Sequence, residues 1–305
     1  MSTGDMVAIV VAGVLMLPAA TAAGGRPAGD YEKEIRHWRE EREARLKADG
    51  GWLTVAGLYW LREGDNRFGT DPGNAFVLPK SSAPAEVGVF TLRDGHVTAR
   101  LDAGVTASLD GHPAQTGREI GMRPDTAGEP DVLTLNALSM HVIQRGDRYG
   151  IRLKDLNSAA RRTFTGLRWY PIQEPYRVQA RFEPYDPPRT IPIPTILGTT
   201  DDMPCPGAAV FTLNGRKLRL DPVIEEPGAD ELFFIFADQT NGKETYPSGR
   251  FLYAAFPKDG TLILDFNKAY NPPCAFTPYA TCPLPPPQNR LPVRIEAGEL
   301  SYGHH

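Results

Sequence analysis

The sequence predicts a mainly β protein in which two antiparallel β units pack together behind one N-terminal helix. Three observations lead to this prediction. Apolar and polar residues alternate over most of the chain after Gly51, turn dipeptides recur about every ten residues, and only one stretch has helical spacing. The 30 Gly and 29 Pro residues follow no period, which is typical of many turns between short strands.

The N-terminal end has the pattern of a secretory signal peptide. An apolar run from Met6 to Leu17 is followed by Pro18 and the small-residue stretch AATAAGG, so we expect residues 1–23 to be removed after Ala22 or Ala23. A run of about twelve residues is too short to span a bilayer. The chain is therefore predicted to be periplasmic or secreted, with no membrane association beyond the signal peptide. Because no Lys or Arg precedes the run, a buried N-terminal helix is the alternative.

The stretch DYEKEIRHWREEREARLK predicts a helix over residues 30–48. Acidic residues open it, basic residues close it, and Gly50-Gly51 follow. Ile35, Trp38 and Leu46 form a thin apolar stripe, so we expect this helix to lie across the surface of a sheet.

After the helix, hairpin patterns follow one another. EVGVFTL-RDG-HVTARL, MHVIQR-GDRY-GIRLKD and AVFTL-NG-RKLRL each join two alternating runs by a short turn, and Asn214-Gly215 is the sharpest of these turns. We place a first β unit at residues 51–165, with a sandwich fold, and a second at residues 166–303, with a barrel or sandwich fold.

Polar side chains gather in the second unit around three successive strand patterns. ELFFIFA (Glu231 to Ala237), RFLYAAF (Arg250 to Phe256) and TLILDFN (Thr261 to Asn267) have short connections, which predict an antiparallel meander. In such a meander the end of the first strand, the start of the second and the end of the third share one edge. The residues expected to meet at this edge are Asp238, Glu244, Tyr246, Arg250, Asp265 and Asn267.

Two interpretations of this cluster remain open. Carboxylates beside a guanidinium shift one another's pKa values, as an acid/base site requires, but they also form buried ion-pair networks that only close the end of a barrel. In the first interpretation Glu244, Asp238 and Asp265 are the candidate catalytic residues. The candidate ligand-binding residues are then Arg250, Tyr246, Asn267, Tyr270 and Asn271.

The ligand that fits the first interpretation is a small polar molecule, a saccharide or an organic acid. Carboxylates and amides bind hydroxyl groups, and arginine binds anions. The sequence does not determine whether the protein is an enzyme, nor which reaction it would catalyse, although hydrolysis fits paired carboxylates. The alternative is a noncatalytic exported module that presents loops to another protein.

Next comes a proline-rich ribbon, AYNPPCAFTPYATCPLPPPQNRLPV, that cannot form a helix or a central strand. Within it, Cys274 and Cys282 enclose a short loop, and a disulfide between them is expected in an oxidising compartment. A metal site is the alternative, but two thiols without a nearby His fall short of the four ligands that zinc requires. Cys205 is left over.

Several function classes have no support in the sequence. The net charge of −4 comes from interspersed acidic and basic residues, so no nucleic-acid surface is predicted. We find no glycine-rich phosphate loop, no nucleophile elbow and no HExxH motif. No cofactor and no metal are therefore expected. His141 falls at the centre of a predicted strand and is interpreted as a packed core residue.

The longest motifs resemble a known bacterial family. GWLTVAGLYWLREGDNRFGTDPGNAFVLP, RGDRYGIRLKD, ETY-x-x-GRFLYA and LDFNKAYNPPCAFTPYATCPLPPPQNRLPVRIEAGE together resemble the domain-of-unknown-function family numbered 1684. The resemblance extends over most of residues 30–299. It implies no particular activity.

A second likeness lies within the first. EGDNRFGTDPGNAFVLP resembles the opening strands of a forkhead-associated (FHA) domain, which implies an FHA-like sandwich for residues 51–165. The phosphothreonine-reading Arg and Ser-x-x-His of that fold have no counterpart, because Gly69 is followed by Thr70 and no such His follows.

Overall fold

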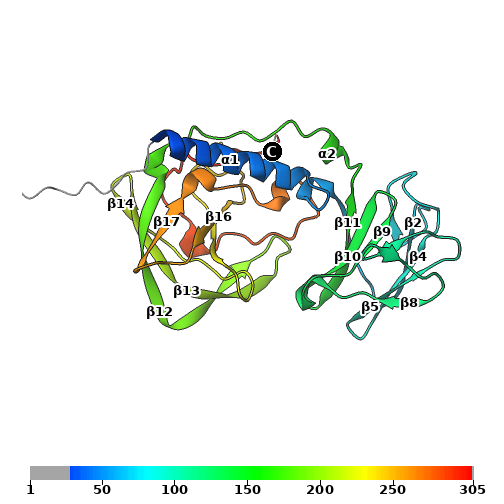
Figure 1. Cartoon of the computed structure of the whole chain (residues 1–305). Coiled ribbons are helices and arrows are strands. Elements are labelled where there is room, and N and C mark those ends of the chain that lie inside the picture. Colours follow the sequence, from blue (N-terminus) through cyan, green and yellow to red (C-terminus); the bar gives the residue numbers. More distant parts are fainter. Residues whose placement is uncertain (1–27, 304–305) are drawn as a thin grey trace, which may run out of the picture.

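The structure, a computed structural model, describes residues 28–303. The predicted signal peptide, residues 1–23, lies outside this range. The mainly β fold with one long N-terminal helix is confirmed. Two β units lie side by side, and the helix α1 (Ala28–Lys47) crosses the top of the second unit and reaches toward the first (Figure 1). No helix among residues 28–303 is long and apolar enough to span a membrane.

The face of α1 that contacts the protein follows the predicted stripe and adds two polar members. Tyr31, Ile35, Arg42 and Leu46 are buried along it, at the spacing of three to four residues that keeps side chains on one helix face. After the first β unit, the chain returns beside α1, where Trp38 packs edge-on against Trp169 at 5.8 Å. The helix is thereby held between this returning segment and the second unit.

The first unit is a sandwich of a six-stranded and a five-stranded sheet. Apolar residues of both sheets, among them Phe68, Phe90 and Leu153, form one core between them. β2 and β3 pair in parallel, and the other pairings in both sheets are antiparallel. In sheet order the six strands are β1 (Val55–Trp60), β11 (Arg148–Asp155), β10 (Leu138–Arg145), β9 (Val132–Leu135), β6 (Ser108–Leu109) and β7 (His112–Pro113). The five are β3 (Phe76–Val77), β2 (Gly64–Gly69), β4 (Gly88–Arg93), β5 (His96–Leu101) and β8 (Glu119–Gly121).

The second unit contains a four-stranded and a two-stranded antiparallel sheet around a common core. Val223, shortly after β14, pairs with Phe233 of β15 and so connects the two sheets. Asn214 and Gly215 join β13 to β14 with φ angles of 51° and 73°, the left-handed values that a two-residue hairpin of this kind requires. The four strands are β14 (Arg216–Leu220), β13 (Thr200–Leu213), β12 (Arg177–Pro194) and β17 (Thr261–Asp265), and the two are β15 (Glu231–Phe236) and β16 (Arg250–Ala255).

The predicted three-strand meander is only partly correct. β15 and β16 pair as expected, but β17 pairs with β12 and not with β16. The other edge of β16 is occupied by Tyr270, which exchanges two backbone hydrogen bonds with Phe251. The ends of β15, β16 and β17 therefore do not share one continuous edge.

The remaining helical pieces are short. α2 (Ala159–Arg162) leaves the first unit, and the other pieces are single 3-10 turns at Trp52–Thr54, Asp125–Ala127, Glu174–Tyr176, Phe266–Lys268, Pro273–Ala275 and Pro287–Asn289. The proline-rich ribbon carries two of these turns and no strand. Cys274 and Cys282 form the expected disulfide, with their Cα atoms 6.3 Å apart, and Cys205 is buried and free.

Candidate functional site

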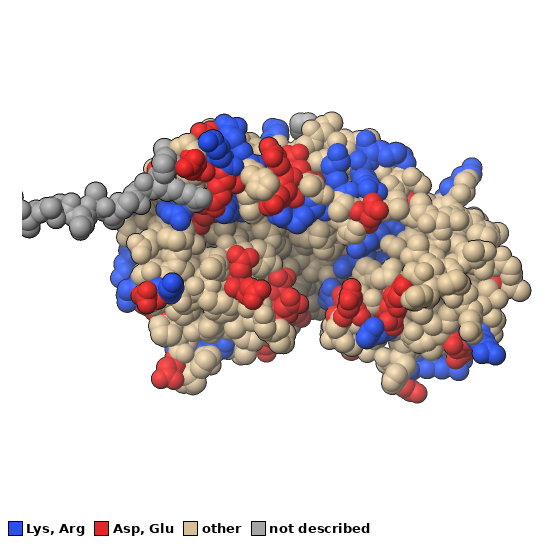
Figure 2. Space-filling view, in the orientation of Figure 1, with Lys and Arg blue, Asp and Glu red and all other residues tan. Residues whose placement is uncertain are grey.

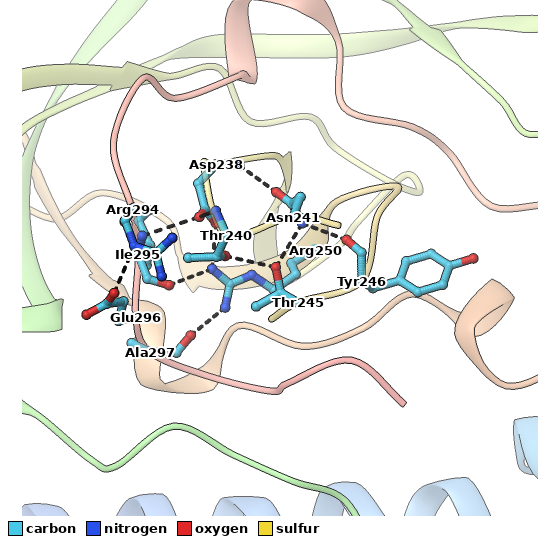
Figure 3. A network of polar contacts seen from close by, with 10 residues as sticks. All are labelled: Asp238, Thr240, Asn241, Thr245, Tyr246, Arg250, Arg294, Ile295, Glu296 and Ala297. Carbon is cyan, nitrogen blue, oxygen red and sulfur yellow. Dashed lines mark hydrogen bonds and ion pairs between the residues drawn. The ribbon is translucent and has the colours of Figure 1, made fainter. Parts of the chain in front are cut away.

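Asp238 and Arg250 form a fully buried ion pair at one end of the β15–β16 hairpin (Figure 3). Asp238 follows β15, Arg250 begins β16, and Arg250 Nη2 lies 2.6 Å from Asp238 Oδ2 with both side chains 0% exposed. Arg250 also donates hydrogen bonds to the carbonyl oxygens of Ile295 and Ala297. Thr240 N donates to Asp238 Oδ1 at 2.8 Å. This pair ties the hairpin to the C-terminal segment and leaves no path for a ligand.

The loop that joins the two residues of this pair is held by its own polar side chains. Asn241 accepts from Asp238 N at 2.6 Å and donates to the carbonyl oxygen of Tyr246 at 2.7 Å. The hydroxyl groups of Thr240 and Thr245 bond to each other at 2.8 Å. The Tyr246 ring points away from Arg250 (Figure 3) and packs with Leu46 and Phe276.

Glu244 lies elsewhere, at the surface. Its Oε1 accepts a hydrogen bond from Arg294 at 2.9 Å, and its side chain is 39% exposed. It lines a cavity of about 450 Å³ together with Arg168, Tyr170 and Lys243. Burial, followed by the charge of Glu244, raises the pKa of Tyr170 to about 12. Glu244 is thus close to Asp238 and Arg250 in the sequence, but its side chain lines a separate surface cavity.

Asp265 ends β17 beneath α1. Its Oδ1 accepts from Tyr31 Oη at 2.8 Å and from Asn267 N at 3.2 Å. Asn267 is anchored in turn, because Gln173 N donates to its Oδ1 at 3.0 Å. Burial raises the pKa of Asp265. Among the described residues every hydrogen bond to this carboxyl goes to Oδ1, so Oδ2 is left for the pocket that Asp265 lines.

That pocket has a volume of about 660 Å³ and lies between α1 and the β15–β17 region. Acidic and basic side chains gather along the helix, and the surface is hollowed below it (Figure 2). Cations, carboxylates and aromatic rings all contribute to its wall. The polar and aromatic residues of this wall are Glu34, Trp38, Arg42, Arg45, Arg177, Glu231, Tyr253, Asp265, Lys268 and Tyr270.

Arg42 connects the pocket wall to the C-terminal segment. Its guanidinium stacks 4.5 Å from the centre of the Tyr270 ring, and Nη2 donates to the carbonyl oxygen of Asn271 at 3.0 Å. Its Nε lies 3.5 Å from Glu299 Oε2, and Asn271 Nδ2 donates to Glu299 Oε1 at 2.8 Å. Burial raises the pKa of Glu299 to about 7, although the positive charge of Arg42 opposes the rise.

The family comparison matches the second unit. Residues 162–300 match the family described as a protein of unknown function, DUF1684. This part of the chain belongs to that family. The DUF1684 region contains Asp238, Glu244, Arg250, Asp265 and Glu299, whereas α1 with Arg42 precedes it.

Among solved structures, an uncharacterised protein of Haloarcula marismortui is 30% identical, with a TM-score of 0.39, and the match covers 46% of this chain and 78% of that chain. An FhaA FHA domain, complexed with the intracellular domain of Rv3910, is 16% identical over 32% of this chain and 97% of that chain, with a TM-score of 0.22. The N-terminal FHA domain of S. cerevisiae Rad53p, complexed with a phosphothreonine peptide, is 13% identical, with a TM-score of 0.20. The match covers 37% of this chain and 77% of that chain. No curated protein matches the chain.

The predicted site residues thus fall in several places, and Tyr246 packs apart from the others with Leu46 and Phe276. Asp238 and Arg250 meet in the dry interior, and Glu244 lies at the second cavity. Asp265 and Tyr270 line the pocket beneath α1. They do not converge at one edge, because β17 leaves the β15–β16 hairpin and pairs with β12.

Sequence reasoning missed Arg42 and Glu299. Arg42 lies on the apolar stripe of α1, four residues after Trp38 and four before Leu46, and a charged residue at such a position is a usable signal of a buried polar contact. Glu299 gives no comparable signal, because it follows the last predicted strands in an irregular segment. Within residues 28–303, no group of three or more His, Cys, Asp or Glu side chains could hold a metal ion.

Proposed function

We propose that the DUF1684 region, together with α1, binds a small hydroxylated organic acid, such as a sugar acid, in the pocket beneath α1. The observation that carries this proposal is the composition of the pocket wall. Four cationic side chains, Arg42, Arg45, Arg177 and Lys268, line one space together with three carboxylates, Glu34, Glu231 and Asp265. A volume of about 660 Å³ lies within the range of small-molecule pockets, roughly 300–1,000 Å³.

The cations favour a ligand that carries a carboxylate. Lys268 pairs with Glu34 at 2.9 Å, and Arg45 approaches Glu41 at 3.8 Å. Arg177, by contrast, makes no ion pair within residues 28–303, although its guanidinium lies over the Tyr31 ring at 5.9 Å. A guanidinium binds a carboxylate through two parallel hydrogen bonds, so Arg177 is proposed as the anion-binding residue.

Asp265 is a hydrogen-bond acceptor, which favours hydroxyl groups on the same ligand. Its Oδ2 is oriented by the three hydrogen bonds that fix Oδ1, and a carboxylate oxygen accepts a hydrogen bond from a sugar hydroxyl. The rings of Tyr253 and Tyr270 stack 6.3 Å apart and supply an apolar wall for the carbon skeleton.

Catalysis is a second proposal for the same pocket. A carboxyl with a raised pKa in a pocket is a candidate general acid, and Asp265 is the residue that meets this description. Glu244 and Asp238, the other predicted catalytic residues, do not line this pocket. Binding is therefore the main proposal, and hydrolysis would depend on Asp265.

Calorimetry with the whole chain tests the proposal. Glucuronate and gluconate should bind, whereas neutral glucose should not. Arg177→Gln should weaken glucuronate binding about tenfold, because one charge-assisted contact is lost. Arg181→Gln is the matched control: it lies on the same strand, is exposed, and pairs with Glu183 outside the pocket. Equal affinity of both variants and wild type, or equal binding of glucose, would overturn the proposal.

We also propose that this function is exercised outside the cytoplasm. The apolar run before the small-residue stretch and the Cys274–Cys282 disulfide support export. Intact-mass measurement of the protein from a periplasmic fraction should show a chain that begins near Ala23 or Gly24. A full-length chain recovered only from the cytoplasm would contradict export.

A further inference from the structure

The outer face of the six-stranded sheet carries a group of cations. Along β11, Ile151 and Leu153 point into the sandwich core, so Arg152 and Lys154 point to the opposite face, toward the second unit. His141 of β10 lies directly across from Arg152. With Gly50, Trp52 and Val55, these three side chains line a cavity of about 260 Å³.

Arg152 is buried in this cavity without a counter-charge. It is 6% exposed and makes no ion pair within residues 28–303. Its guanidinium lies 5.1 Å from the Trp52 ring centre, its Nη2 reaches Thr281 Oγ1 only at 3.4 Å, and its Nε has no hydrogen-bond partner. Among the described residues Arg39, Arg42 and Arg250 also have an unpartnered Nε. Glu299 and Asp238 lie beside Arg42 and Arg250, and Arg39 is only half-buried, over the Trp169 ring.

The rest of the lining adds positive charge and no carboxylate. Among the described residues, Lys154 Nζ donates only to the carbonyl oxygen of Gly50, at 2.8 Å. The nearby acid Asp125 is engaged with Arg145 at 2.9 Å. Burial and the neighbouring cations lower the pKa of His141 to about 4, so its ring is neutral at pH 7 and retains one N–H donor.

An uncompensated buried guanidinium is costly unless an anion neutralises it. Here a guanidinium, an ammonium group and an imidazole line one cavity that is large enough for a tetrahedral ion, and the Trp52 ring also lines it. We propose that this cavity binds a small oxyanion, phosphate or sulfate, at the junction of the two β units. Arg152 and Lys154 provide the charge and His141 provides a neutral hydrogen bond.

The proposed oxyanion site is separate from the pocket beneath α1. The two cavities share no lining residue, and only the larger one carries carboxylates. The proposal therefore does not depend on the proposed function, and variants of the two sites distinguish them.

Isothermal calorimetry and thermal unfolding of the whole chain test the proposal. Sodium phosphate and sodium sulfate should bind and raise Tm relative to sodium chloride at equal ionic strength. Lys154→Gln, at the half-buried edge of the cavity, should weaken phosphate binding about tenfold, because one charge-assisted contact is lost. Arg148→Gln on the same strand, with its side chain over Trp60 and away from the cavity, should bind as wild type does.

Three further measurements extend the test. Arg152→Met should abolish binding, and its circular dichroism spectrum shows whether it folds; if it does not fold, Lys154→Gln still decides. Arg177→Gln should keep full phosphate affinity. Tighter binding of glycerol 3-phosphate than of inorganic phosphate would assign the oxyanion to an organic ligand, and the reverse order would assign it to the free ion. No phosphate effect beyond that of chloride, or unchanged affinity in Lys154→Gln, would overturn the proposal.

Discussion

Two arginine–carboxylate pairs, one within the second unit and one between α1 and the C-terminal segment, have the same chemistry and different surroundings. The Arg250 and Asp238 side chains are 0% exposed and meet at 2.6 Å, whereas the Arg42 side chain is 10% exposed on a pocket wall and lies 3.5 Å from the buried Glu299. Both pairs involve the same C-terminal segment: the carbonyl oxygens of Ile295 and Ala297 accept hydrogen bonds from Arg250, and the Glu299 carboxylate lies 3.5 Å from Arg42 Nε. Residue type alone therefore does not identify a binding site; access to an open space does.

The difference also separates two roles of buried charge. A pair that is closed off and supported by backbone groups ties distant segments together, and it is costly to break because either partner alone is an uncompensated charge. A pair on a pocket wall keeps donors and rings available to a ligand.

The largest effect is expected from Arg250→Met. The change leaves the Asp238 carboxylate buried without its partner, which should lower the free energy of unfolding by about 3–5 kcal/mol. Urea denaturation followed by tryptophan fluorescence measures it. Arg294→Met, which breaks the exposed pair with Glu244, should change stability little, because surface ion pairs contribute little. Equal effects of the two substitutions would show that the buried pair has no special role.

Removal of the disulfide should have the next largest effect. The double substitution Cys274→Ala and Cys282→Ala opens a loop of about nine residues, which should lower stability by about 2–3 kcal/mol on the chain-entropy model. This ribbon contains Tyr270 of the pocket wall, so ligand affinity should fall too, while the Asp238–Arg250 pair stays intact. A reductant should destabilise the wild type by the same amount and leave the double variant unchanged. An unchanged urea midpoint in the double variant would contradict this expectation.

Glu299, which lies beside Arg42, should make the stability of the protein depend on pH. Its pKa in the folded protein is raised from 4.5 to about 7, so folding favours the protonated carboxyl. The contribution of this group to stability is then largest below pH 4.5, falls as the pH rises to about 7, and is constant above it. The slope should not exceed about 1.4 kcal/mol per pH unit, the value for one proton.

The difference between wild type and Glu299→Gln in urea midpoints from pH 4.5 to 8 isolates this slope, because the other groups titrate in both proteins. Glu296→Gln is the control, since Glu296 is 47% exposed three residues away in the same segment and pairs with Arg294. A pH profile of Glu299→Gln parallel to that of wild type would show that Glu299 is ionised throughout in the folded state.

Local patterns predicted the fold, but long-range pairing decided the site. The stripe of α1 and the Asn214-Gly215 turn depend on neighbouring residues, so their sequence signals are direct. β17 pairs with β12, more than eighty residues earlier in the chain, and no local pattern specifies that choice.

For the same reason Arg250 was predicted correctly to approach Asp238, which lies across one hairpin, and incorrectly to approach Asp265. Arg42 and Glu299 are separated by most of the chain, so only their contact in the folded protein identifies them as a pair.

Tyr31→Phe should give the smallest effect and tests how α1 is attached at the open pocket. Its hydroxyl donates to Asp265 Oδ1 at 2.8 Å and accepts from Asn267 Nδ2 at 2.9 Å, so its loss should cost about 1 kcal/mol of stability. The hydrogen bond from Tyr31 lowers the pKa of Asp265 against the effect of burial, so the pKa of this carboxyl should rise further in the variant. Urea denaturation and an NMR titration of the Asp265 carboxyl measure the two effects.

Tyr176→Phe is the control, because the Tyr176 hydroxyl makes no hydrogen bond to the described residues, and it should change neither quantity. An unchanged Asp265 pKa in Tyr31→Phe would mean that the helix does not set the state of the carboxyl, and α1 would then be only a cover for the pocket.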